Sequence, residues 1–277
     1  MPDVLRRAAT VRVAGGRGSP GARIVPEEAP VALVYDGTTH AVMMASPADL
    51  EDFAVGFSLT EGKIAALADI RELEVVEHDA GIEVRMWLAP GAGRGAADRR
   101  RAMLGPTGCG LCGIDSLAAA LPVLPPVGAG GAFSTADVVA AVASVRPAQV
   151  LNREARALHA AGFWTSADGL VALREDVGRH NALDKLAGAL ARAGTDARTG
   201  VLVMTSRLSV ELVQKAAVLG VPVVAAVSAP TALALRTADA AGITVVGVAR
   251  DDGFEIFTRP ERILLAATED RDVRAAG

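Results

Sequence analysis

The chain has 277 residues, which suggests two domains because one domain usually holds about 100–200 residues. Hydrophobic residues make up 51% of the chain and charged residues 22%, so it can bury a large core and is not globally disordered. A formal net charge of −4 argues against a general nucleic-acid binder, and an aromatic content of 3% argues against a base-stacking platform. Two cysteines three positions apart cannot form a disulfide framework, which suggests a reducing compartment.

Targeting and membrane signals are not evident in the sequence. The first 16 residues hold three arginines but no apolar run behind them, so we expect no secretory signal. Residues 216–235 carry no charge and are long enough to span a bilayer, but they include a glycine and two prolines. A buried strand flanked by two helices is the better interpretation of this stretch. We therefore expect a soluble, cytoplasmic protein that does not bind a membrane.

The N-terminal part of the chain predicts a small, mostly antiparallel α+β unit. The first 25 residues are rich in Gly and Arg without periodicity, so we expect a flexible tail there. Residues 31–44 predict two strands joined at Asp36-Gly37, which is the strongest short hairpin signal. A helix with apolar residues at helical spacing is expected next, ending at Gly62, and residues 70–88 predict a second hairpin.

The C-terminal part predicts an α/β unit. Ser134 is expected to cap a helix, a hairpin is expected around Asp168-Gly169, and a helix is expected over residues 178–193. From residue 201 onward, strands alternate with helices in a βαβαβ pattern, which is typical of a parallel sheet with helices on its faces. The predicted division is a tail over residues 1–25, an α+β domain over 26–121 and an α/β domain over 132–277.

Polar clusters follow the three strands of the predicted parallel sheet, where such sheets bind ligands. The clusters contain Ser206 and Arg207 after the first strand, Ser228 and Thr231 after the second, and Arg250 after the third. Two clusters lead into helix N-termini, whose amides suit phosphate, and the arginines add positive charge. Helix capping and solvated loop charges are the alternative explanation. Neither a Walker lysine motif nor a Gly-x-Gly-x-x-Gly motif is present.

Cys109 and Cys112 form a Cys-x-x-Cys pair among four glycines. Structural zinc needs four ligands, and none of the four histidines is spaced as a second pair, so we expect no metal site. A thioredoxin-like redox pair would lie between a strand and a helix. The Gly- and Arg-rich residues 89–113 instead predict a mobile arm, on which a thiolate of lowered pKa can accept and pass on a sulfur atom.

Residues 174–185 combine several chemically active side chains. If they form a helix, His180 and Asp184 would line one end of a cleft together with the flanking Arg179 and Lys185. The chain has only three lysines against 25 arginines, which hints that some of the lysines are kept for a specific role. A solvated helix surface is the alternative interpretation, and we favour it for Lys63.

Taken together, these motifs closely resemble the formate dehydrogenase accessory sulfurtransferases, the FdhD family. The matching segments are residues 31–62, 107–113 (TGCGLCG), 175–186 (EDVGRHNALDKL) and 206–260. They cover most of the chain from about residue 30 onward, and their combination is far more specific than an isolated Cys-x-x-Cys pair.

The resemblance implies a sulfurtransferase that takes sulfur from a cysteine desulfurase as a cysteine persulfide. The sulfur goes to the bis(molybdopterin guanine dinucleotide) molybdenum cofactor before that cofactor enters formate dehydrogenase. Cys109 then resembles the persulfide carrier and Cys112 a helper. The cofactor-binding stretch of the family corresponds to Val248, Ala249, Arg250, Asp251, Asp252 and Gly253. The family also implies a homodimer with a cytidine-deaminase-like, three-layer α/β/α domain.

The sequence departs from the family pattern at two places. Arg156-Ala157 precede His159 where a Thr-Gly pair is usual, which weakens any role for His159. Asp251 and Asp252 adjoin Arg250, and two carboxylates beside a phosphate are unfavourable unless they point away or bind guanine amines. Deaminase chemistry is not expected, because His159 is not followed by the necessary acid and no downstream Cys-x-x-Cys exists.

The leading hypothesis is therefore a sulfurtransferase that also binds the cofactor near His180 and the strand ends, with GDP as a mimic of its guanine ends. A guanine-dinucleotide cofactor chaperone without sulfur transfer is the alternative, and a disulfide oxidoreductase is a third possibility.

Overall fold

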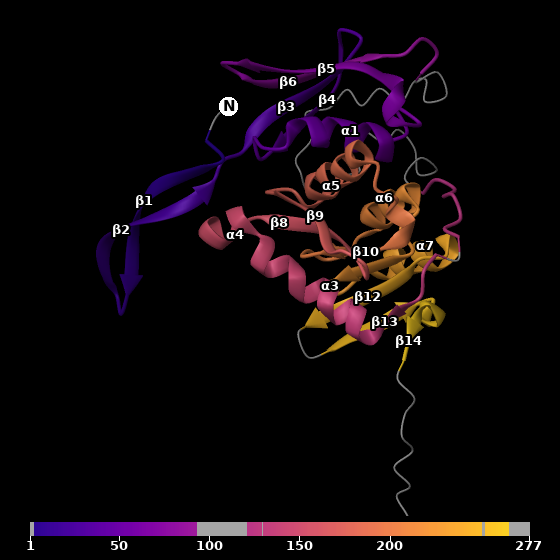
Figure 1. Ribbon diagram of the computed structural model, residues 1–277. Helices are drawn as coiled ribbons and strands as arrows, with labels where there is room; N and C mark the ends of the chain where they lie inside the picture. The colour runs from indigo at the N-terminus through magenta and orange to yellow at the C-terminus, as the bar shows by residue number, and fades with distance from the viewer. Residues whose placement is uncertain (1–2, 93–120, 129, 251–252, 266–277) are drawn as a thin grey trace, which may run out of the picture.

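The computed structural model describes residues 3–92, 121–128, 130–250 and 253–265. Within them, a four-stranded sheet and one helix lie above a larger α/β unit, and a two-stranded hairpin extends away from both (Figure 1). The structure is therefore a mixed α/β fold with several sheets, as the sequence predicted at this level.

The small sheet has the strand order β4-β3-β6-β5. Its strands are β3 (Ala29–Tyr35), β4 (Thr38–Ala45), β5 (Ile70–His78) and β6 (Gly81–Leu88), and helix α1 (Leu50–Thr60) packs on one face. The predicted Asp36-Gly37 turn is confirmed. Asp36 and Gly37 both have positive φ angles, 47° and 79°, as a type I′ hairpin turn requires. The second predicted hairpin and the helix that precedes it are confirmed as well.

The large sheet has six strands in the order β13-β12-β11-β10-β8-β9. The strands are β8 (His159–Thr165), β9 (Gly169–Asp176), β10 (Val201–Met204), β11 (Val223–Ala226), β12 (Thr244–Arg250) and β13 (Gly253–Thr258). Only the neighbours β10, β11 and β12 are parallel, whereas β8, β9 and β13 join antiparallel. The predicted βαβαβ unit is confirmed, and the structure adds the antiparallel strand β13 and the β8–β9 hairpin to the same sheet.

Helices cover both faces of the large sheet. Helix α3 (Thr135–Ala148) packs on one face, and α5 (Arg179–Ala193), α6 (Val210–Leu219) and α7 (Ala232–Ala241) pack on the other. Ser134 caps α3 as predicted, because its hydroxyl accepts a hydrogen bond from the amide of Asp137 at 3.1 Å. The uncharged stretch around β11 belongs to α6, β11 and α7. In the parts of the chain that the structure describes, no helix is long and apolar enough to cross a membrane.

The remaining elements are short, apart from the N-terminal hairpin. They are α4 (Val150–Ala155), the paired strands β7 (Phe133–Ser134) and β14 (Ile263–Leu264), and 3₁₀ turns at Leu67–Asp69, Ala197–Thr199 and Pro260–Arg262. The sequence predicted no regular structure before residue 26, but β1 (Leu5–Ala14) and β2 (Arg17–Pro26) pair over their whole length. That prediction was wrong because it weighed composition and overlooked Gly15-Gly16, a two-residue turn signal between two alternating segments.

Helices α1 and α5 join the small sheet to the large α/β unit at very close range. A Cβ atom added to Gly56 would lie 1.7 Å from the carbonyl oxygen of Asp184, and one added to Gly188 would lie 1.9 Å from that of Asp52. Glycine on each helix therefore permits direct backbone contact. We call this contact and its flanking charged side chains the α1–α5 joint.

Candidate functional site

The carboxyl ends of β9, β10, β11 and β12 meet at one edge of the large sheet. Because β8 runs antiparallel to β10, its first residue, His159, lies at the same edge. The edge also receives the N-termini of α5 and α6, which follow β9 and β10 in the chain. The structure therefore brings together, at one edge, the loops in which the sequence predicted a nucleotide-like ligand.

Two of these loops are tied to each other. The backbone amide of Thr231 donates to the carbonyl of Leu208 at 3.0 Å, and Leu208 forms a parallel bridge with Pro230. The loop after β12 joins them, because the guanidinium of Arg250 donates to the carbonyl oxygen of Val227. The three strand-end clusters are neighbours in space.

The predicted polar residues differ in what their side chains do. Ser206 is buried, and its hydroxyl donates to the carbonyl of Arg207 at 3.0 Å. Thr231 is the N-cap of α7, since its hydroxyl accepts from the amide of Ala234 at 3.2 Å. For Thr231 the capping explanation therefore accounts for the side chain. Arg207 and Arg250 are exposed, and Ser228 is half-buried.

His180 forms the centre of a second polar group that the sequence only partly predicted. Its Nε2 atom lies 3.8 Å from Oε2 of Glu211, which is too long for a hydrogen bond. His180 is 5% exposed and Glu211 is 7% exposed. Neither of these two atoms, nor the hydroxyl of Ser209, has a hydrogen-bond partner among the described residues.

Such a group is unusual, because buried polar atoms are nearly always hydrogen-bonded. It lies at two helix N-termini without side-chain caps, since the N-caps Gly178 of α5 and Ser209 of α6 make no capping hydrogen bond. Burial alone would raise the pKa of Glu211, but His180 and Ser209 beside its carboxylate outweigh burial and lower it. The pKa of His159 at the same edge is also lowered, by burial and then by Arg179.

The backbone at the end of β12 is strained. Val248 has a φ angle of 52°, in a region that β-branched residues rarely adopt, and it lies within a bulge between Gly247 and Arg250. Such strain is often found at functional sites. Val248 and Ala249 lie in this bulge and Arg250 pairs with Gly253 beside it, whereas Asp251 and Asp252 lie outside the described residues.

Asp184 and Lys185, expected to line a cleft beside His180, instead belong to the α1–α5 joint. Lys185 is fully buried and contacts Asp176 at 2.7 Å and the carbonyl oxygen of Ser46 at 2.9 Å. Asp184 accepts from Lys215 at 2.8 Å and from the hydroxyl of Thr60 at 2.7 Å. The expectation failed because both residues face partners that are distant in the sequence. Two of the three lysines do have specific roles, and those roles are structural.

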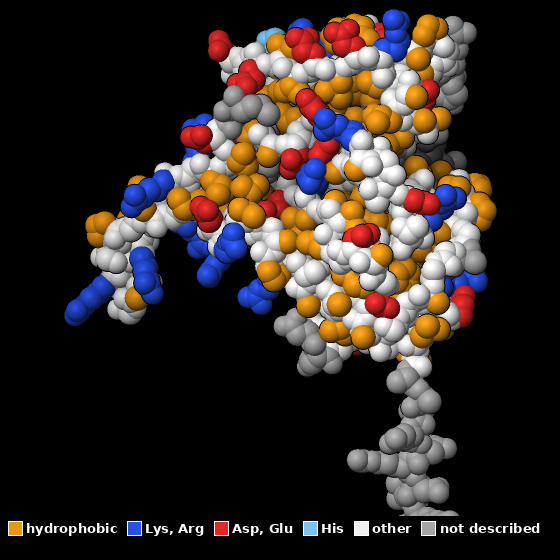
Figure 2. Space-filling model, in the orientation of Figure 1, with side chains coloured by type: hydrophobic (Ala, Val, Ile, Leu, Met, Phe, Trp, Pro, Cys, Tyr) orange, Lys and Arg blue, Asp and Glu red, His pale blue; other side chains and the backbone are white. Residues whose placement is uncertain are grey.

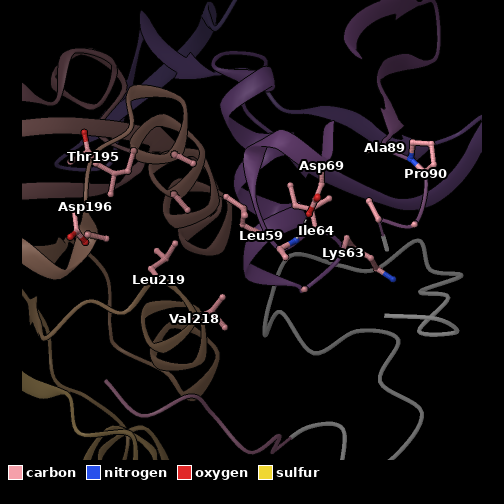
Figure 3. A pocket seen from close by; sticks show the side chains of 18 residues that line it. Leu59, Lys63, Ile64, Asp69, Ala89, Pro90, Thr195, Asp196, Val218 and Leu219 are labelled. Atoms are coloured by element: carbon pink, nitrogen blue, oxygen red, sulfur yellow. Dashed lines mark hydrogen bonds between the residues drawn. The ribbon is translucent and has the colours of Figure 1, made fainter. Parts of the chain in front are cut away.

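A cavity of about 960 Å³, which no sequence pattern predicted, lies at the opposite ends of α5 and α6. Figure 3 shows Leu59, Lys63 and Asp69 on one side of it and Thr195, Asp196 and Leu219 on the other. Residues 89–92 also line the cavity and lead directly into residues 93–120. Cys109, Cys112 and most of the predicted arm lie outside the described residues.

The fold and these features define the class of protein. It is a mixed α/β protein in which one edge of the large sheet carries buried polar atoms without hydrogen-bond partners among the described residues. The sequence profile described as the FdhD/NarQ family matches residues 26–264. The chain is 56% identical over 94% of its length to the sulfur carrier protein FdhD of Agrobacterium fabrum, of which the match covers 96%. It is 49% identical over 86% of its length to the protein of the same name from Cupriavidus necator, of which 83% is covered. The chain belongs to the FdhD/NarQ family.

A solved structure agrees with the fold. It is a chain from Desulfotalea psychrophila described as a candidate formate dehydrogenase accessory protein, with a TM-score of 0.77 and 24% sequence identity. The match covers 95% of this chain and all of that one.

Proposed function

We propose that this protein is a sulfur carrier that serves formate dehydrogenase. The observation that carries the proposal is the 56% identity to a sulfur carrier protein over nearly the whole chain. The matched part includes the Cys109-Gly110-Leu111-Cys112 motif. In this role the protein takes sulfur from a cysteine desulfurase and delivers it to the bis(molybdopterin guanine dinucleotide) molybdenum cofactor, which it binds as its substrate.

The chemistry assigned to Cys109 is thiol exchange with a persulfide. Its thiolate attacks the outer sulfur of the donor's persulfide, the donor's S–S bond breaks, and the donor leaves as a thiolate. Cys109 then holds the sulfur as its own persulfide, and no external oxidant or reductant is needed. Cys112 has a helper role in this scheme.

The carboxyl edge of the large sheet suits the phosphate and guanine ends of the cofactor. Arg207 and Arg250 supply exposed positive charge, and the uncapped N-termini of α5 and α6 supply backbone amides. His180 and Glu211 offer a donor and an acceptor without partners among the described residues. We further propose that the large α/β unit resembles cytidine deaminases in its three-layer α/β/α arrangement. Their chemistry is not part of the proposal.

Mass spectrometry tests the persulfide directly. After incubation with a cysteine desulfurase and cysteine, the peptide with Cys109 should gain the mass of one sulfur atom. Cys109→Ala should abolish activation of formate dehydrogenase and leave GDP binding intact, and Cys112→Ala should have a milder effect. Full activity of Cys109→Ala would overturn sulfur transfer and favour a cofactor chaperone. Equal loss in both variants, with a reversible disulfide, would favour an oxidoreductase.

Calorimetric titration with GDP tests the cofactor site. Each charge-assisted hydrogen bond to phosphate contributes roughly 1.5–3 kcal/mol, so Arg250→Ala should weaken GDP binding about tenfold or more. The loss should shrink as the salt concentration rises. Arg153→Ala, which removes an exposed arginine from α4, is the matched control and should leave binding unchanged. Equal affinities of wild type and Arg250→Ala would remove Arg250 from the site.

The remaining parts of the proposal have two sources. The homodimer follows the family resemblance, whereas the cytoplasmic location and the lack of binding to nucleic acid or membranes follow from the composition and sequence.

A further inference from the structure

The N-terminal hairpin, Leu5–Pro26, extends away from the rest of the chain (Figure 1). Its strands pair from Leu5 opposite Pro26 to Ala14 opposite Arg17, and β2 contacts α4. Almost all of its side chains are exposed, including Val11 at 70% and Val13 at 69%. An isolated two-stranded hairpin is only marginally stable in water, so a partner surface would stabilise this one.

The register divides the hairpin into two unlike faces, because directly paired residues project to the same side and successive residues alternate. One face carries four arginines: Arg6, Arg12, Arg17 and Arg23. The other face carries mostly apolar side chains: Leu5, Ala9, Val11, Val13, Pro20, Ala22 and Ile24, with Arg7 among them. The hairpin therefore presents a cationic face and an apolar face to a partner.

The charge of the chain is divided between the hairpin and the remainder. The hairpin has five arginines and no acidic residue, so its formal charge is +5. The rest of the chain has 23 basic and 32 acidic side chains, a net of −9. The rest of a second copy is thus an oppositely charged partner for the hairpin.

An acidic surface lies on the small sheet, where Arg85 of β6, opposite Glu74, is paired with Glu83. β5 is an edge strand, which leaves one side of its backbone unpaired within the sheet. Leu73 and Val75 face α1, so the exposed Glu72 and Glu74 alternate with them and project from the opposite face. Figure 2 shows acidic side chains gathered over this sheet and basic ones along the hairpin.

We propose that the N-terminal hairpin binds a second copy of this chain, with its arginine face against Glu72 and Glu74 of β5 in that copy. Reciprocal binding of this kind produces a closed dimer. A closed dimer contains two such contacts, and each hairpin contributes the arginine face of its 22 residues to one of them. This inference rests on the homodimer of the proposed function and specifies its contact surface, independently of sulfur transfer.

Sedimentation analysis of the full chain at low and high salt tests the proposal through charge reversal. Arg12→Glu with Arg23→Glu should weaken dimerisation at least about tenfold, and so should Glu72→Arg with Glu74→Arg. Combining all four substitutions should restore the dimer, because the contacts are then reversed rather than lost. The control, Arg146→Glu with Arg236→Glu, makes the same charge change at exposed sites on α3 and α7 and should leave the dimer unchanged.

Three results would overturn the proposal: a monomeric wild-type chain, a dimer insensitive to either pair of reversals, or no restoration in the combined variant. Circular dichroism of each variant shows whether its fold is kept. Persulfide formation on Cys109 is measured in parallel. If any of these three results is found while the wild-type chain still forms the persulfide, the hairpin contact alone is refuted. If the wild-type dimer responds as expected but the wild-type chain forms no persulfide, the sulfur carrier alone is refuted.

Discussion

The α1–α5 joint and the carboxyl edge of the large sheet differ in whether their buried polar groups have partners. In the joint, the carboxylate of Asp176 is paired with Lys185 at 2.7 Å and also accepts from the amide of Ser46 at 2.9 Å. At the edge, His180 and Glu211 are also buried, but their facing atoms have no hydrogen-bond partner among the described residues. Helix α5 contributes to both regions.

The same contrast holds for backbone conformation and helix ends. The joint uses glycine to bring two helices into contact without strain, whereas the edge keeps Val248 at a positive φ and leaves two helix N-termini without side-chain caps. Satisfied groups stabilise the fold, and unsatisfied groups retain their capacity to bind a ligand. Substitutions should therefore reduce stability in the joint and change it little, or increase it, at the edge.

The largest effect is expected for Lys185→Met in the joint. This change leaves the carboxylate of Asp176 fully buried without its counter-charge, which should lower the free energy of unfolding by about 3–5 kcal/mol. Urea unfolding of the full chain measures it. Lys63→Met, at the half-buried rim of the cavity, is the matched control and should cost less than about 1 kcal/mol. Similar costs for both variants would contradict the importance of the buried pair.

Gly56→Ala should have the next largest effect. The new methyl group would lie 1.7 Å from the carbonyl oxygen of Asp184, so α1 and α5 must separate, which should cost about 3 kcal/mol. Gly128→Ala is a suitable control, because an added Cβ there meets no atom within 4 Å. Thermal or urea unfolding that shows no difference between the two would refute the close contact.

At the edge, Val248→Gly should raise stability by about 1 kcal/mol, since glycine adopts a positive φ without steric strain. The control is Val171→Gly on β9, where φ is not positive, and it should lower stability by a similar amount. If Val248→Gly also weakens GDP binding, the strained bulge helps to shape the site. A loss of stability in Val248→Gly would show that its contacts outweigh its strain.

The smallest effect is expected for Glu211→Gln, with less than about 1 kcal/mol at neutral pH. The pKa of Glu211 lies below its ordinary value near 4.5, so the ionised carboxylate stabilises the fold above that pH. This contribution is lost as the pH falls through the lowered pKa. Unfolding at pH 7 and at progressively lower pH should therefore show wild type and Glu211→Gln converging in acid. A constant difference would mean that Glu211 is not the titrating group.

The sequence alone predicted most of the secondary structure, because the relevant signals are local. Asp36-Gly37 accommodates two positive φ angles, and Ser134 caps α3 by accepting from the amide three residues later. The alternation after residue 201 follows from chain connectivity. The resemblance to the FdhD family was also contained in the sequence. The N-terminal hairpin was missed although its Gly15-Gly16 turn was visible, so that error was one of interpretation.

The tertiary structure decided how each charged residue of α5 is used. His180 and Asp184 are one helical turn apart and were assigned to one cleft, yet Asp184 meets Thr60, 124 residues away, and His180 meets Glu211. Lys185 likewise depends on Ser46, 139 residues away. Local sequence patterns determine which segments become helices and strands, because backbone geometry depends on near neighbours. Whether a buried charge finds a partner depends on packing between distant segments, and only the folded chain sets that.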